Sequence, residues 1–136
     1  TPWPFLTYAS LLELSGNTEN ALIYLDKAMN KTYDFENNLI ADILAKKTNI
    51  LFNKNDYEGA LFHAMQLYQR DKLKALTLTD PGDIYLAEGK IKEAIDFWNK
   101  NLNDLQMPDY IKSLITSKLE VVKRINENDK DRDHSH

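Results

Sequence analysis

GDIYLAEGKIKEAIDFW, residues 82–98, is the segment from which the architecture of this chain can be worked out. Gly89 divides the segment, and glycine readily adopts the left-handed backbone conformation at which helices end. After this turn, Ala94 and Trp98 stand four residues apart, which places them on one face of a helix. Residues 82–98 therefore predict two short helices joined by a tight turn.

The same arrangement occurs twice more, with a small residue five positions after each turn residue. The turn residues are Gly16, Asn55 and Gly89, and the small residues are Ala21, Ala60 and Ala94. Seven positions before each turn residue stand Ala9, Thr48 and Gly82. At these positions the first helix of a pair is expected to approach the second so closely that a large side chain would separate them. The pattern indicates three stacked helical hairpins.

Helical periodicity extends over most of the chain and predicts seven helices and no strand. The expected helices cover residues 3–14, 18–29 with Thr18 as the cap, 38–53, 56–68 with Asp56 as the cap, 81–88, 91–102 and 108–125. The second and third small residues are 34 positions apart, whereas the first and second are 39 apart, which implies a longer connection around residues 33–38. Residues 70–79 belong either to a lengthened preceding helix or to a loop.

The amino-acid composition of the chain argues against several classes of function. The 136 residues carry a net charge of −4 without a basic cluster, so nucleic acid is not an expected partner. The absence of cysteine excludes disulfides and thiolate chemistry, and no apolar run is long enough for a membrane-spanning segment. Because the sequence starts with Thr1, an upstream signal, anchor or domain is an open alternative, and the compartment is left undetermined.

The aligned residues resemble the tetratricopeptide repeat (TPR) family. The best match is residues 82–98, whose residues at the family's glycine, tyrosine, glycine, alanine and large aromatic positions are Gly82, Tyr85, Gly89, Ala94 and Trp98. The resemblance covers residues 2–106, and the helix from Pro108 is similar to the helix that caps such arrays. It implies an all-α, right-handed α-α superhelix, or solenoid, of three TPR-like hairpins plus a C-terminal capping helix. The helical domain is expected at residues 1–126, followed by a disordered polar tail at 127–136.

The resemblance implies a non-catalytic protein–protein interaction module, an adaptor or scaffold that holds a peptide segment of its partner in a concave groove. The residues expected to line this groove and bind the partner are Ser10, Glu13, Lys46, Asn49, Phe52, Asn53 and Asp83. The amides of Asn49 and Asn53 can satisfy a peptide backbone, and Phe52 can serve as an apolar anchor. The competing interpretation is that the two amides only face water and that Phe52 packs against a neighbouring hairpin.

No sequence motif indicates catalysis, and we expect neither a metal nor a cofactor. His63 has no carboxylate or second histidine at helical ligand spacing, and His134 and His136 stand in the polar tail. Two other hypotheses remain. The chain could be a regulatory or peptide-sensing domain of a larger protein, or it could self-associate through the first hairpin, where Trp3 and Phe5 are left uncovered.

Overall fold

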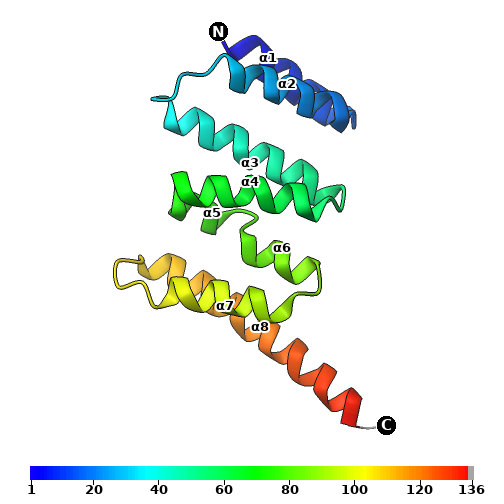
Figure 1. Cartoon of the computed structure of the whole chain (residues 1–136), viewed down its shortest axis with the longest axis vertical. Helices are drawn as coiled ribbons and strands as arrows, with labels where there is room; N and C mark the ends of the chain where they lie inside the picture. The colour runs from blue at the N-terminus through cyan, green and yellow to red at the C-terminus, as the bar shows by residue number, and fades with distance from the viewer. Residues whose placement is uncertain (135–136) are drawn as a thin grey trace.

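The protein is built from helices, as the sequence predicts. The computed structural model describes residues 1–134, and the side chains of residues 1–131 (Figure 1). The helices in this part of the chain are α1 (Trp3–Leu14), α2 (Thr18–Asn30), α3 (Asn37–Asn53), α4 (Tyr57–Arg70), α5 (Lys72–Thr77), α6 (Pro81–Ala87), α7 (Ile91–Leu102) and α8 (Asp109–His134). No strand occurs among residues 1–134.

The three predicted turn residues all have the expected left-handed backbone. Their φ angles are +82° at Gly16, +63° at Asn55 and +79° at Gly89. In two of the three turns the next residue caps the following helix: the side chain of Asn17 accepts a hydrogen bond from the backbone N–H of Asn20, and that of Asp56 from Gly59. The helix boundaries at these turns are therefore fixed by local chemistry.

Helices that follow one another form antiparallel pairs, and the pairs lie one above the other along the long axis (Figure 1). The most extensive helix–helix contacts are within the pairs α1–α2, α3–α4 and α6–α7. Adjacent pairs meet where α2 contacts α3 and where α4 contacts α6, and α8 packs on α7. Each pair therefore buries apolar surface both between its own helices and against the pair next to it.

Residues 70–79 form neither a continuation of the preceding helix nor a simple loop. They contain the short helix α5, so the described residues hold eight helices rather than the predicted seven. Asp71 ends α4 and accepts a hydrogen bond from the backbone N–H of Lys74, which starts α5. The Leu76 side chain is fully buried with Trp98 and Ile111, so α5 fills the space between the second pair and α8.

The polar segment beyond Asn126 also differs from the sequence-based expectation. In place of a disordered tail from residue 127, α8 continues to His134. Its buried stripe ends at Val122, and the remaining turns extend away from the other helices (Figure 1). Each residue added to an existing helix gains a backbone hydrogen bond, and Glu120 stands four residues before Arg124, a spacing that supports an exposed helix.

In the third pair the backbone of α6 lies close against a side chain of α7. A Cβ atom built on Gly82 would lie 2.4 Å from Cε2 of Trp98, well inside van der Waals contact. The equivalent positions Ala9 and Thr48 are also buried, with 3% and 1% of their surface exposed. The small residues predicted for the helix crossings are therefore all buried, and Gly82 is the one without room for a side chain.

We predict that Gly82→Ala lowers the free energy of unfolding by about 1–3 kcal/mol, because the added methyl group overpacks the contact with Trp98. Urea denaturation measures the effect. In a Trp98→Leu background the methyl group has room, so the same change should cost less than about 0.5 kcal/mol. An equal cost in both backgrounds would contradict this explanation.

Candidate functional site

A row of four hollows follows one side of the molecule, along α1, α3, α6 and α8. Their volumes, in order along the row, are about 290, 490, 410 and 270 Å³. Neighbouring hollows share lining residues: Lys46 belongs to the first two, Thr79 to the second and third, and Asp83 and Leu86 to the last two. The four hollows therefore adjoin one another along this side, and we call the row the α1–α8 groove.

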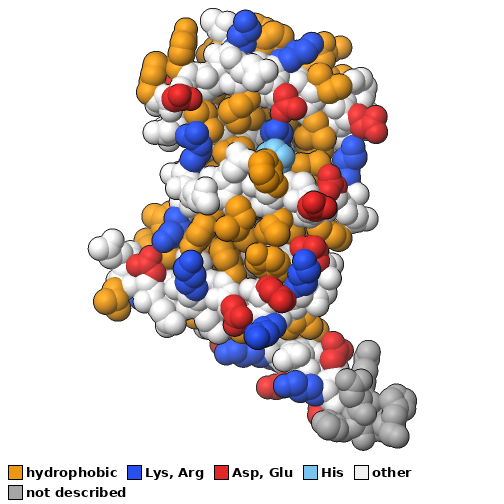
Figure 2. All heavy atoms as spheres, in the orientation of Figure 1, with side chains coloured by type: hydrophobic (Ala, Val, Ile, Leu, Met, Phe, Trp, Pro, Cys, Tyr) orange, Lys and Arg blue, Asp and Glu red, His pale blue; other side chains and the backbone are white. Residues whose placement is uncertain are grey.

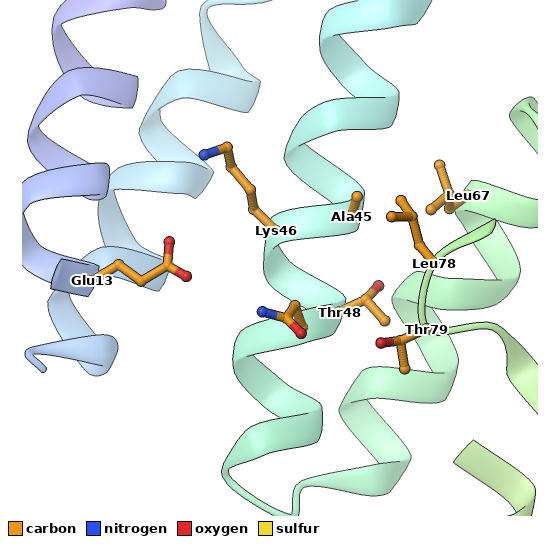
Figure 3. Close-up of a pocket in the computed structure, with 8 residues that line it drawn as sticks. Glu13, Ala45, Lys46, Thr48, Leu67, Leu78 and Thr79 are labelled. Atoms are coloured by element: carbon orange, nitrogen blue, oxygen red, sulfur yellow. The ribbon is translucent and has the colours of Figure 1, made fainter. Parts of the chain in front are cut away.

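The largest hollow has an apolar floor with charged and polar residues at its edge. Its apolar lining consists of Ala45, Leu67 and Leu78, and its polar lining of Glu13, Lys46, Thr48, Asn49 and Thr79. Glu13 extends from α1, and Lys46 from α3, into the space between these two helices (Figure 3). Neither charge forms an ion pair with another described side chain. Both are therefore available to a bound molecule.

The fold brings six of the seven predicted site residues to this groove. Ser10 lines the first hollow, Glu13, Lys46 and Asn49 the second, and Phe52 and Asp83 the third. Asn53 is exposed at the last position of α3 and lines none of the four hollows. That these residues contact a partner stays a prediction.

Two of the six have structural contacts of their own. The Phe52 ring is half-buried and packs edge-on against Tyr57, with the ring centroids 5.7 Å apart. One carboxylate oxygen of Asp83 accepts a hydrogen bond from the backbone N–H of Asp80 at 3.1 Å and lies 2.9 Å from Nζ of Lys118. Phe52 is therefore both a groove residue and part of the packing within the second pair, and the charge of Asp83 is already paired.

Several groove residues were not expected from the sequence. Leu78 and Thr79, in the connection between α5 and α6, line the largest hollow, and Lys118 and Val121 of α8 line the last one. The sequence left open whether residues 70–79 are helix or loop, so no sequence pattern placed Leu78 and Thr79 on this face. The four-residue spacing of Leu114 and Lys118 marks one side of α8, but it does not show which helix that side meets.

A buried carboxylate connects three helices at the end of the groove. Asp80 is fully buried, and its side chain accepts a hydrogen bond from the backbone N–H of Asp83 at 3.0 Å, which caps α6. It also accepts one from the indole N–H of Trp98 in α7 at 3.2 Å and one from the ammonium group of Lys118 in α8 at 3.1 Å. These bonds fix α8 relative to the third pair.

Burial and the nearby charge of Asp83, in that order, raise the pKa of Asp80 to about 6 against the opposing effect of Lys118. Burial alone would lower the pKa of Lys118, but the charges of Asp80 and Asp83 outweigh this, so the pKa lies above its ordinary value. Elsewhere, burial lowers the pKa of His63, whose Nδ1 atom is 2.8 Å from the carbonyl oxygen of Gly59.

The described residues contain no group of three or more histidine, cysteine, aspartate or glutamate side chains that could hold a metal ion. His136 and the side chain of His134 lie outside the described part of the chain. None of the helices within residues 1–134 combines the length and hydropathy that a bilayer crossing requires.

Comparison of the chain with protein-family models, with curated proteins and with solved structures gives no match. The resemblance to the tetratricopeptide repeat is therefore carried by the chain's own residues, and membership of that family stays a prediction.

We predict that the free energy of unfolding depends less on pH in the Asp80→Asn variant than in the native chain. Because the folded-state pKa of Asp80, about 6, is above its ordinary value of 3.8, its contribution to stability is present at low pH and is lost as the pH rises to about 6. Asparagine caps a helix equally well and carries no charge. The free energy of unfolding of the variant relative to the native chain should rise by about 2 kcal/mol between pH 4.5 and pH 7.

Urea denaturation at a series of pH values measures this difference. Asp96→Asn, at an exposed position of α7, is the matched control for the change in net charge. An Asp80→Asn profile that stays parallel to that of the native chain would show that the buried carboxylate does not have the raised pKa.

Proposed function

We propose that this chain is a non-catalytic protein-interaction module of the tetratricopeptide-repeat type, and that the α1–α8 groove binds an extended peptide segment of a partner protein. The observation that carries this proposal is that the hollows adjoin one another in a single row. One row of hollows, joined by shared residues, runs along the first helix of each pair and ends at α8. A long open groove suits a chain segment better than a compact small molecule.

The architecture we propose is a right-handed solenoid of three TPR-like hairpins, capped by α8. Its support comes from features that recur in every pair: a left-handed turn residue, a buried alanine five positions later and a small residue at the helix crossing. The stacking of pairs along one axis is consistent with this arrangement. The longer spacing after the first pair and the inserted helix α5 are departures from a uniform repeat.

The lining of the groove offers both kinds of contact that peptide recognition needs. Leu78, 43% exposed, and Leu86, half-buried, offer apolar surface to side chains of the peptide. The Asn49 amide and the Thr79 hydroxyl can exchange hydrogen bonds with its backbone. The unpaired charges of Glu13 and Lys46 would influence which peptides bind, because they must be matched or stay hydrated.

We predict that peptides selected from a displayed random library bind the native chain and lose affinity for the double variant Asn49→Ala, Leu78→Ser. Both side chains are exposed, so the variant should fold, and circular dichroism checks that it does. Each truncation removes about 1 kcal/mol or more if the residue is a contact, so together they should weaken binding roughly tenfold or more. Isothermal titration calorimetry measures the dissociation constants.

The matched control is Phe62→Ser, which changes a side chain of α4 that is 63% exposed and lines none of the four hollows. It should bind the selected peptides as the native chain does. Selection of no peptide, or equal affinity for the native chain and the double variant, would contradict the proposed use of the groove.

A further inference from the structure

The outer face of α1 is apolar and largely uncovered. Residues 4, 8, 11 and 14 follow one side of the helix, and none of them is charged. Tyr8 is 46% exposed, Leu11 58% and Leu14 85%. The helix at the end of a repeat array normally presents a polar outer face to water, because no neighbouring repeat covers it. The outer face of α1 instead has the composition of a face that is covered.

The opposite end of the molecule does have a polar outer face. The apolar stripe of α8 packs on α7 and stops at Val122. Beyond that residue, the exposed turns of α8 carry charges of both signs, interspersed with polar residues (Figure 2). The α8 end is therefore closed by a cap, whereas the α1 end is not.

The repeat shows what the outer face of α1 is suited to contact. Leu11 has its equivalent 39 positions later, at Ile50 of α3. Ile50 is buried together with Ile43, on the same side of α3, in a cluster with residues of α2. Between these two residues, Lys47 forms an ion pair with Asp26 of α2 at 2.5 Å. In α3, these positions therefore form the face that docks on the preceding pair.

The third pair uses the same face in the same way. Its residue equivalent to Leu11 and Ile50 is Ile84 of α6, which is fully buried against Ala60 and Ala64 of α4. This position of the repeat is thus an apolar residue at an interface in both later pairs. In α1 the position is again apolar, but nothing in the described part of the chain covers it.

The helix that receives the docking face has the same character at both interfaces. It is the second helix of the pair that precedes the docking helix in the sequence. Its buried side carries small residues, Ala21 and Ala28 in α2, and Ala60 and Ala64 in α4. Because a methyl group takes little space, a leucine or isoleucine of the docking helix can pack above it.

Among residues 1–134, no second helix has such a side left uncovered. α2 is covered by α3, α4 by α6, and α7 by α8. In α7, Ala94 and Trp98 are buried in one cluster with Ile111 and Ile115 of α8. A second copy of this chain therefore cannot supply the receiving helix by head-to-tail stacking.

We propose that the outer face of α1 docks on the second helix of a further helical pair, which directly precedes α1 in the same polypeptide. The receiving pair stands before the docking helix in the sequence at both interfaces within this chain, and the new interface continues that order. The second helix of the added pair carries small residues on its buried side, as α2 and α4 do. The proposal rests on the repeated arrangement of the pairs and does not depend on peptide binding in the α1–α8 groove.

A tandem duplication of residues 1–39 in front of Thr1 provides a probe for this docking. Residues 1–39 contain α1, α2 and the connection to α3, so the added copy of α2 precedes the native α1 at the spacing that separates α2 from α3. Trp3→Phe in the added copy lets mass spectrometry distinguish the two α1 segments. We expect backbone amides of the native α1 to exchange with deuterium at least roughly tenfold more slowly than in the chain without the duplication, because docking suppresses local opening.

Two lysine variants test whether the face itself is responsible. Leu11→Lys in the native α1 of the duplicated chain buries an unpaired charge and should abolish the protection. Leu105→Lys makes the same change at a residue that is 95% exposed between α7 and α8, and should keep it. In the chain without the duplication, Leu11→Lys should change the exchange of α1 by less than about twofold, because an exposed substitution costs little. Circular dichroism establishes that each variant folds, and Leu11→Ser replaces the lysine variant if lysine unfolds the first pair.

Exchange of the native α1 at the same rate with and without the duplication would overturn the proposal. Equal loss of protection in the Leu11→Lys and Leu105→Lys variants would do the same. Mass spectrometry of the protein isolated from its source gives the residues that precede Thr1 in the natural polypeptide. We expect a helical pair with small residues in its second helix, and a polypeptide without such a pair directly before Thr1 would also overturn the proposal.

Discussion

The backbone of α6 lies directly against the indole ring of Trp98, and the third pair depends on this contact. There is no room for a side chain at position 82, so the α6 backbone contacts the indole ring directly. The indole N–H then reaches Asp80, and the ammonium group of Lys118 meets the same carboxylate and lies 5.7 Å from the centre of the ring. One crossing thus positions three helices and the α8 end of the groove.

In the other two pairs, the position equivalent to Gly82 has room for a small side chain. Ala9 occupies the crossing of the first pair, and Thr48 that of the second, where its hydroxyl donates to the carbonyl oxygen of Leu44 at 2.8 Å. This bond satisfies a polar group that is almost completely buried. Each first helix is then free to direct its remaining side chains to the next pair or to the groove.

The turns and pairs could be predicted because their causes are local. Gly16, Asn55 and Gly89 each stand where few other residues tolerate the backbone, and alanine follows at a fixed distance. Helix α5 had no such signal: its six residues become helical because Leu76 is buried by residues far away in the sequence. The contact between Asp80 and Lys118 also could not be predicted from a local pattern, because the two residues are 38 positions apart in the sequence. Six of the seven residues expected at the groove line its hollows, whereas Asn53, four residues after Asn49, is exposed where α3 ends and lines none of them.

The two tryptophans occupy opposite extremes of environment, since Trp98 is 1% exposed and Trp3 is 63% exposed. Indole emission shifts to shorter wavelength when water is excluded, so the fluorescence spectrum of this protein is the sum of a core band and a solvent band. The core band reports on the third pair and α8, and the solvent band reports on the outer end of α1. Conformational changes at the two ends of the molecule can therefore be distinguished by emission wavelength, without an attached dye.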